Sequence, residues 1–332
     1  MSGLRMQAVV GHRLESLEDY GLDCLPLPQP GPGQVRLKVH SVGLGFADGL
    51  LCTGRYQLKP ALPFVPGCEF AGVIDALGPG VNGLEPGQRC SVTAMGGGCA
   101  EFAVVPVSSL VPLPDGLDFA RAAAFWVDYT TALHALQDRA RLQPGERVLV
   151  LGAAGGLGLA AVQIARLLGA EVIAAASTAD KREAARAAGA QQCLDTRAAD
   201  WSLRLKDLTG GDGVDVIFDP VGGDGFETAF RRLAWGGRHL MLGFAGGGIP
   251  ALPTNLALLK GAALLGVDIR QFALHEPKKA AAARERLARW VGDGTLQPAA
   301  GVNYALSDFR AALASTFDRQ RIGKTILTVL QE

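Results

Sequence analysis

The segment from Gly152 to Gly158 has the residue types and spacing that could hold the phosphates of a nucleotide. Ala153, Gly155 and Gly158 take the three small-residue positions of a G-x-G-x-x-G pattern. The second position lets the backbone approach a pyrophosphate, and the third lets a helix pack close to a strand. A strand-like run precedes this turn and a helix-like run follows it, which is the context that the pattern requires. We therefore expect a dinucleotide site here in preference to an ordinary tight turn.

The end of the next expected strand indicates which dinucleotide is bound. An NAD site usually carries Asp or Glu about 20 residues beyond the glycines, to hold the ribose 2′-hydroxyl. Here residues 174–178 read Ala-Ala-Ala-Ser-Thr, and Lys181 and Arg182 follow. A carboxylate would repel a 2′-phosphate, whereas a hydroxyl with a nearby cation would hold it. NADPH is the predicted cofactor; the alternative is that Lys181 and Arg182 only form a solvated helix face.

Composition narrows the function classes. The chain has 332 residues, with 32 Lys and Arg against 32 Asp and Glu, which argues against a whole-chain affinity for nucleic acid or a membrane surface. This length suggests two domains. Glycine accounts for 44 residues, about twice its usual share, and marks turns and close backbone approaches. Six scattered cysteines and no N-terminal signal pattern predict reduced thiols and a cytoplasmic location.

The first part of the chain reads as short strands separated by Pro/Gly turns, which is typical of a small β-barrel or sandwich. The expected strands are 6–10, 35–42, 73–77, 89–93 and 100–105.

From Arg147 onward, strands and helices alternate, which predicts a parallel sheet buried on both faces. The expected strands are 147–151, 171–176, 192–195, 214–219 and 238–243, and the expected helices are 156–168, 179–188, 200–208 and 225–234. The apolar stretch 148–165 approaches the length of a membrane helix, but its glycines favour a strand, a turn and a helix. A helix over 277–292 and a closing strand over 323–330 complete the chain.

Several further motifs resemble a known family. They are Gly45-Phe46-Ala47-Asp48, Gly54-Arg55-Tyr56, Pro66 to Gly72, Gly87-Gln88-Arg89, Tyr129 to Ala132, Asp219 to Gly223 and Gly323-Lys324. Together with the 153–158 turn, they resemble the zinc-independent medium-chain dehydrogenase/reductase superfamily, in its NADPH:quinone oxidoreductase (zeta-crystallin-like) group. The stretch 233–247 most resembles the quinone oxidoreductase-like protein 2 branch. The resemblance extends from residue 6 to residue 330.

The resemblance implies an α/β protein of two domains with the active site in the cleft between them. A GroES-like β-barrel domain would comprise residues 1–120, completed by 261–332. A Rossmann domain, with a doubly wound parallel sheet, would comprise residues 121–260. The resemblance also implies a homodimer through the edge of the Rossmann sheet, at Ala263–Ile269.

The resemblance further implies a set of cofactor contacts. Thr130 would touch the nicotinamide end, Ser177 and Lys181 the 2′-phosphate, and Thr196, which is often Tyr in the family, the adenosine. Arg319 would reach the cofactor from the C-terminal segment. The residues implied for the pyrophosphate and then for the nicotinamide side are Ala154, Gly155, Gly156, Leu157, Val221, Gly243 and Phe244.

Gly45 and Tyr56 are expected to line the substrate site, although Tyr56 could equally cap the barrel and the family usually has Asn at position 45. Zinc-dependent relatives use Cys where this chain has Gly45 and His where it has Cys68, so we expect no metal. The five histidines occur singly, and no Tyr/Lys or His/Asp constellation is evident. No catalytic residue is therefore assigned. A reaction that needs neither a metal nor a strong acid or base fits best: hydride transfer from NADPH to an already electrophilic quinone, with the proton from water.

Two alternatives remain. The acceptor could be a 2-alkenal or an enoyl-CoA thioester, for which Arg55, Lys59 and Arg270 could supply a basic entrance. An NADPH-binding crystallin-like or RNA-binding protein with little turnover is the alternative of another class, and the neutral charge argues against it.

Overall fold

The computed structural model describes residues 4–299 and 301–330, which form two compact units. Unit 1 comprises the residues up to 127 and from 288 onward, and unit 2 comprises 128–287. This division differs from the expected one at 121–127 and at 261–287. Residues 126 and 127 stay with unit 1 because their N–H groups donate to the Glu69 carboxylate. Residues 263–266 stay with unit 2 because they add a strand to its sheet.

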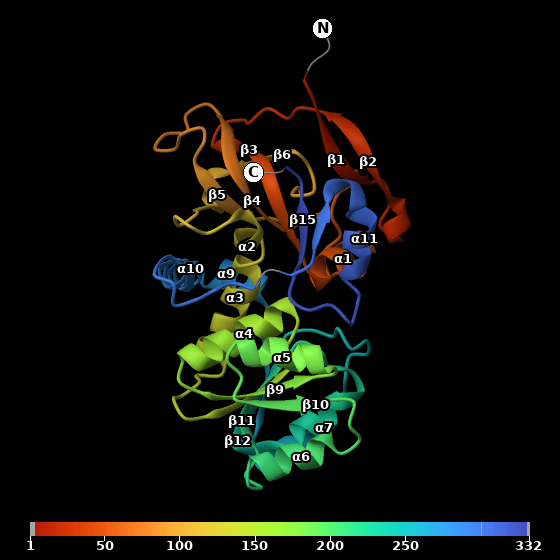
Figure 1. Ribbon diagram of the computed structural model, residues 1–332, viewed down its shortest axis with the longest axis vertical. Coiled ribbons are helices and arrows are strands. Elements are labelled where there is room, and N and C mark those ends of the chain that lie inside the picture. Colours follow the sequence, from red (N-terminus) through yellow and green to blue (C-terminus); the bar gives the residue numbers. More distant parts are fainter. Residues whose placement is uncertain (1–3, 300, 331–332) are drawn as a thin grey trace. The chain divides into compact units, whose positions relative to one another are not determined.

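Unit 1 is built on a seven-stranded sheet with the order β14-β15-β3-β4-β5-β7, in which β6 also pairs with β3 (Figure 1). All pairs are antiparallel except β14 with β15. Alternate residues of β3, such as Val35, Leu37 and Val39, are buried in its core, as the period of two in a strand requires. The strands are β3 (Gln34–Leu44), β4 (Glu69–Leu77), β5 (Arg89–Thr93), β6 (Phe102–Pro106), β7 (Leu110–Pro112), β14 (Asn303–Ala305) and β15 (Thr325–Thr328).

A second, two-stranded sheet and short helices complete unit 1. The sheet pairs β1 (Arg5–Gly11) with β2 (Tyr20–Pro26). The helices are α1 (Phe46–Cys52), α2 (Phe119–Ala123) and α11 (Phe309–Ser315). The C-terminal strand β15 pairs with the end of β3, so the C-terminal segment completes this domain, as the resemblance implies. The sequence did not predict β2, β7, β14, α1 or α11.

Unit 2 contains a six-stranded parallel sheet with the order β10-β9-β8-β11-β12-β13 (Figure 1). Counted along the chain, this is the order 3-2-1-4-5-6 of a Rossmann fold, which confirms the predicted fold class. The strands are β8 (Arg147–Leu151), β9 (Glu171–Ala176), β10 (Gln192–Asp195), β11 (Val214–Asp219), β12 (Leu233–Met241) and β13 (Ala263–Gly266).

Helices cover both faces of this sheet, with α4 and α5 on one side and α6 and α7 on the other (Figure 1). Leu149 and Ile217 of the sheet pack with Phe226 and Phe230 of α7 in one buried cluster. The helices are α4 (Gly156–Leu167), α5 (Ala179–Ala187), α6 (Trp201–Leu208), α7 (Phe226–Phe230), α8 (Thr254–Lys260) and α9 (Ile269–His275). Two further helices, α3 (Trp126–Leu133) and α10 (Pro277–Gly292), cross the limits of the units.

The expected helix 225–234 and strand 238–243 need correction. The helix ends at Phe230, and β12 already begins at Leu233. Leu233 pairs with Val214, and the register then shifts before Arg238 pairs with Val216. Gly236, with φ +74°, provides the irregularity. The apolar stretch 148–165 is a strand, a turn and a helix, as predicted. Within the residues that the structure describes, no helix is both long and apolar enough to cross a membrane.

Candidate active site

The glycine turn places the start of α4 at the carboxyl end of the parallel sheet. The Ala153 N–H donates to the Ala175 carbonyl at 3.2 Å, which ties the turn to β9. Gly155 is the N-cap residue of α4, and no side chain caps this helix. The first N–H groups of an α-helix have no partner within it, and they attract anions. The turn therefore presents backbone donors to a phosphate.

Two glycines of this turn differ in what requires them. A Cβ on Gly158 would lie 2.3 Å from the Gly152 carbonyl oxygen, so the packing of α4 on the turn demands glycine. A Cβ on Gly155 would have only that same oxygen nearby, at 3.6 Å, which is an ordinary contact. The φ of Gly155, −73°, suits any residue. The packing therefore does not require glycine at 155, which agrees with the prediction that a pyrophosphate approaches the backbone here.

The corner where β9 ends contains the two groups expected at the 2′-phosphate. Ser177 is half-buried directly after the strand. Lys181 lies in the first turn of α5, and its N–H donates to the Thr178 hydroxyl at 3.4 Å. Lys181 is only 8 % exposed, so it is not part of a solvated helix face. The alternative explanation of Lys181 is therefore wrong.

Arg182 has a structural role at the same corner. It donates to the Ala176 carbonyl at 3.2 Å and forms an ion pair with Asp195 at 3.0 Å. This pair joins α5 to the end of β10. Thr196 follows Asp195 with an exposed side chain, and its N–H approaches the Ala176 carbonyl at 3.4 Å. Ser177, Thr196 and the first turn of α5, which contains Lys181, thus lie at one end of β9, where Arg182 pairs with Asp195.

Two loops at the carboxyl ends of β11 and β12 pack against each other. The Gly246 N–H donates to the Val221 carbonyl at 2.7 Å. A Cβ on Gly222, where φ is +58°, would lie 3.1 Å from the Phe244 ring. A Cβ on Gly243 would lie 3.2 Å from the Pro220 oxygen. The structure therefore brings together Val221, Gly243 and Phe244, the residues implied for the nicotinamide side.

A buried His/Asp pair supports these loops, and the sequence did not reveal it. His239 Nε2 lies 2.9 Å from Asp219 Oδ2, and both side chains are fully buried. Asp219 Oδ1 accepts from the Val221 and Gly222 N–H groups, both at 2.8 Å. This pair is fully buried and is not a catalytic constellation of the kind sought in the sequence. The pair lies beneath the loop and fixes its backbone, so it acts by positioning.

Thr130 has a hydroxyl group that lacks a partner. The residue lies on α3 and is buried, and Thr130 Oγ1 makes no hydrogen bond to any described residue. A helical Thr often bonds the carbonyl one turn earlier, but this one does not. Leaving a buried hydroxyl unpaired costs about 1–3 kcal/mol. Such a group fits the predicted contact with a bound cofactor.

In unit 1, Gly45 stands at the start of α1 beside a buried acid. Asp48 Oδ2 accepts from the Gly45 N–H at 2.8 Å, and Oδ1 accepts from the Cys68 N–H at 2.9 Å. A Cβ on Gly45 would have its nearest neighbours, Asp48 and Lys324, at 3.8 Å. The fold therefore has room for a side chain at position 45.

Cys68 is a neutral thiol in this setting. Burial, and then the carboxylate of Asp48, raise the pKa of Cys68 well above its usual range. Zinc binds cysteine as the thiolate, so this environment opposes a zinc ligand at position 68. Among residues 4–299 and 301–330, no group of three or more His, Cys, Asp or Glu side chains could hold a metal. Zinc independence remains a prediction.

A buried ion pair lies next to Cys68 in the chain, and sequence reasoning treated its members only as family motifs. Lys324 Nζ contacts Glu69 Oε2 at 2.5 Å, and both side chains are almost fully buried. Glu69 Oε1 also accepts from the Val127 N–H at 3.2 Å. Glu69 thus connects the start of α3 to the C-terminal segment of unit 1.

Two expected residues of unit 1 are less constrained. Tyr56 is partly buried against the core, and its N–H donates to the Leu50 carbonyl at 3.1 Å. Arg319 is exposed in the segment between α11 and β15. Their roles at the substrate and the cofactor remain predictions.

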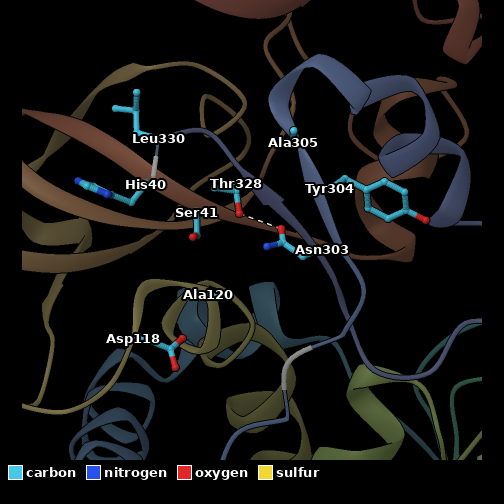
Figure 2. A pocket seen from close by; sticks show the side chains of 9 residues that line it. All are labelled: His40, Ser41, Asp118, Ala120, Asn303, Tyr304, Ala305, Thr328 and Leu330. Carbon is cyan, nitrogen blue, oxygen red and sulfur yellow. Dashed lines mark hydrogen bonds between the residues drawn. The ribbon is translucent and has the colours of Figure 1, made fainter. Parts of the chain in front are cut away.

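Unit 1 also has an open hollow of about 480 Å³ (Figure 2). Thr328 donates to Asn303 across it at 2.8 Å. Its acid, Asp118, accepts from the Arg121 N–H at 2.7 Å and so caps α2. None of the expected site residues lines this hollow, and we assign it no role in the reaction.

Comparison with known proteins identifies the family. The profile of the alcohol dehydrogenase GroES-like domain matches residues 31–115, and that of the zinc-binding dehydrogenases matches residues 156–286. A quinone oxidoreductase-like protein 2 homolog from Nematostella vectensis is 38 % identical over 304 residues, which cover 91 % of this chain and 83 % of that protein. The chain belongs to the medium-chain dehydrogenase/reductase superfamily. Its quinone oxidoreductase-like relatives confirm the group expected from the motifs.

Two other similarities bear on the chemistry of this superfamily member. The quinone oxidoreductase of Thermus thermophilus, whose structure was also solved with NADPH, is 36 % identical, with a TM-score of 0.84 over 98 % of this chain and 100 % of that one. A mycocerosic acid synthase-like polyketide synthase of Mycobacterium tuberculosis is 32 % identical over 99 % of this chain, which corresponds to 15 % of that protein.

Proposed function

We propose that this protein transfers hydride from NADPH to a quinone without the help of a metal. Its membership of an oxidoreductase superfamily and its NADPH cofactor are the best supported parts, since its quinone oxidoreductase relatives include one solved with NADPH. The observation that carries the proposal is the turn of 152–158, where packing requires glycine at 158 but leaves room at 155, as a site for close approach of a phosphate would. The quinone is supported by the names of the relatives.

The residues of this chain would bind NADPH and orient it toward the acceptor. NADPH supplies the hydride when it is bound. The start of α4 would hold the pyrophosphate, and Ser177 with Lys181 would neutralise the 2′-phosphate. The Thr130 hydroxyl would find its partner at the nicotinamide end, beside the loops of Val221 and Phe244. Because a quinone is already electrophilic, correct placement supplies most of the acceleration, and water can provide the proton.

An enoyl thioester is the second candidate acceptor. It is favoured by the similarity to a segment of a polyketide synthase, which covers nearly the whole of this chain. Reduction of a conjugated thioester uses the same hydride donor and needs no metal, so the cofactor site does not distinguish the two acceptors. A 2-alkenal belongs to the same chemistry.

The test is NADPH consumption by the purified protein with 1,4-naphthoquinone, crotonaldehyde and crotonyl-CoA, with NADH in parallel. We expect turnover with the quinone and a preference for NADPH. Absence of turnover with all three would refute the reductase and favour a cofactor-binding protein with little activity. Lys181→Gln should raise the KM for NADPH about tenfold and leave that for NADH unchanged, since it removes one charge-assisted contact. Lys206→Gln is the matched control, since Lys206 is exposed on α6, and it should leave both KM values unchanged.

We also propose a homodimer formed through unit 2, and a cytoplasmic location. Strand β13 ends the sheet order, so one of its edges has no strand partner among the described residues. Four large apolar side chains of β12, α8 and β13 are exposed, namely Trp235, Leu258, Leu259 and Leu264. Exposed apolar groups at a sheet edge are typical of an interface between copies.

A further inference from the structure

Arg270 of unit 2 carries a partly buried positive charge that no nearby carboxylate of the described residues balances. Arg270 lies in the first turn of α9, and its Nε is buried without a hydrogen-bond partner in the described part of the chain. The nearest acid in sequence, Asp268, accepts from the backbone N–H groups of Arg270 and Gln271 at 2.9 and 3.0 Å. Asp268 therefore serves as the cap of α9, and no carboxylate of the described residues pairs with the Arg270 guanidinium. Burying a donor of a charged group without a partner is costly.

Arg270 lies at the edge of the sheet where a ligand is expected. The Val267 N–H donates to the Met241 carbonyl at 3.0 Å, so the segment leading to α9 runs beside the end of β12. The loop of Gly243 and Phe244 continues from that same strand end. In doubly wound sheets, ligands bind outside the carboxyl ends of the strands. Arg270 as a whole is only partly buried, although its Nε is buried.

Helix α9 is also fixed against the helix that carries Thr130. The His134 ring, one turn after Thr130, stacks on the Phe272 ring at a centroid distance of 3.7 Å and an angle of 17°. Because Phe272 is two residues from Arg270, this stacking holds the start of α9 near the turn of Thr130. Arg270 is therefore carried by a helix that a ring contact fixes, and not by a loop.

The local charge favours an anion. Between residues 269 and 287 the chain has five Lys and Arg and only two Glu, although its overall charge is zero. One of these cations, Lys279, already pairs with Glu276. An excess of positive charge raises the local concentration of an anionic ligand.

We propose that Arg270 binds an anionic group of the electron acceptor, so that the protein prefers acceptors that carry a sulfonate, carboxylate or phosphate. This inference rests on the proposed reductase function and narrows its substrate class. The planar guanidinium suits two parallel hydrogen bonds to such a group. Arg270 would thus determine specificity without taking part in hydride transfer.

The test compares two pairs of acceptors that differ in charge. The first pair is 1,4-naphthoquinone and 1,4-naphthoquinone-2-sulfonate, and the second is the crotonyl thioester of N-acetylcysteamine and crotonyl-CoA. We expect Arg270→Gln to lower kcat/KM for the charged member about tenfold or more relative to the neutral one, the factor of a charge-assisted contact. The ratio of wild type to variant cancels the intrinsic reactivity of each acceptor. Lys206→Gln, exposed on α6, should leave the ratio near one.

A readout without turnover separates this inference from the proposed function. In calorimetric titrations, naphthalene-2-sulfonate should bind to the wild-type protein loaded with NADP⁺. Its affinity should fall with Arg270→Gln and partly recover with Arg270→Lys. If Arg270→Gln lowers kcat/KM equally for charged and neutral acceptors and leaves sulfonate binding unchanged, the proposed role of Arg270 is overturned. No turnover with any acceptor but Arg270-dependent sulfonate binding would refute only the reductase. An effect confined to the thioester pair would identify a carrier phosphate as the anion, and one confined to the quinones a small acidic substituent.

Discussion

The two glycines of the β8–α4 turn allow a sharp separation of folding from cofactor binding. Gly158→Ala places a methyl group 2.3 Å from the Gly152 oxygen, more than 1 Å closer than the 3.4 Å at which ordinary contacts begin. Gly155→Ala places one at an ordinary 3.6 Å from that oxygen. The same chemical change, three residues apart, should therefore act on different properties of the protein.

The magnitudes follow from these distances. Overpacking by one methyl group costs about 1–3 kcal/mol, and alanine returns up to about 1 kcal/mol of helix propensity at position 158. We expect Gly158→Ala to lower the free energy of unfolding by about 1–2 kcal/mol, or Tm by about 2–8 °C. Gly155→Ala should change stability by no more than about 0.5 kcal/mol. Its methyl group should displace the pyrophosphate and weaken NADPH binding by about 5- to 150-fold, the loss of one or two charged hydrogen bonds.

The assay measures both quantities on both variants. Thermal unfolding without cofactor gives the change in stability, and calorimetric titration with NADPH gives Kd. The reasoning predicts a large change in Kd with little change in Tm for Gly155→Ala, and a clear fall in Tm for Gly158→Ala. If Gly155→Ala binds NADPH as wild type does, the backbone at 155 does not approach the pyrophosphate and the site has been misplaced.

Four further predictions follow from the structure. Thr130→Val should leave Tm unchanged or raise it, because it removes an unpaired buried hydroxyl, yet it should weaken NADPH binding several-fold; a fall in Tm would show that the hydroxyl has a partner within the protein. Asp219→Asn should lower Tm and raise the Kd for NADPH, because an amide cannot accept both from the Val221 and Gly222 N–H groups and from His239. An unchanged Kd would show that this loop is not part of the cofactor site. Burial raises the pKa of Cys52 to about 12, so the folded state keeps this thiol neutral. The free energy of unfolding should therefore fall as pH rises above about 9, by about 1.4 kcal/mol per pH unit for each such thiol. In urea unfolding across pH 8–10.5, Cys52→Ala should show a shallower fall than wild type. Leu264→Asp should yield monomers by light scattering if β13 forms the dimer edge, and an unchanged mass would exclude that edge.

The sequence predicted unit 2 better than unit 1, for a physical reason. Strands buried on both faces, such as 147–151, must be apolar throughout, and the glycine turn marks where the strand gives way to the helix. In unit 1, helix α1 contains Gly49 and Asp48, which weaken any helical pattern. Asp48 is nevertheless buried there, because it bonds backbone groups of Gly45 and Cys68. Such a residue is recognised only when its distant partner is known.

The same limit explains why the Asp219–His239 pair was missed. The two residues are 20 positions apart, and no local spacing joins them. Strand register does: Asp219 pairs with Met241 across β11 and β12, and residues 239 and 241 point to the same face because side chains alternate along a strand. The contact thus depends on a parallel pairing between strands that a helix separates, which sequence patterns do not specify.

Glycine itself has three meanings in this chain, and only the backbone geometry separates them. At Gly158 the neighbouring carbonyl excludes a Cβ, so the fold selects glycine. At Gly155 the protein leaves room for a Cβ, and the predicted approach of a phosphate to the backbone would favour glycine there. At Gly45 the protein also leaves room, with Asp48 and Lys324 both 3.8 Å from a Cβ, but there the family usually places Asn. A glycine that neither packing nor phosphate demands removes a side chain from the expected substrate region, which would either enlarge the pocket beside the nicotinamide or loosen the hold on the cofactor.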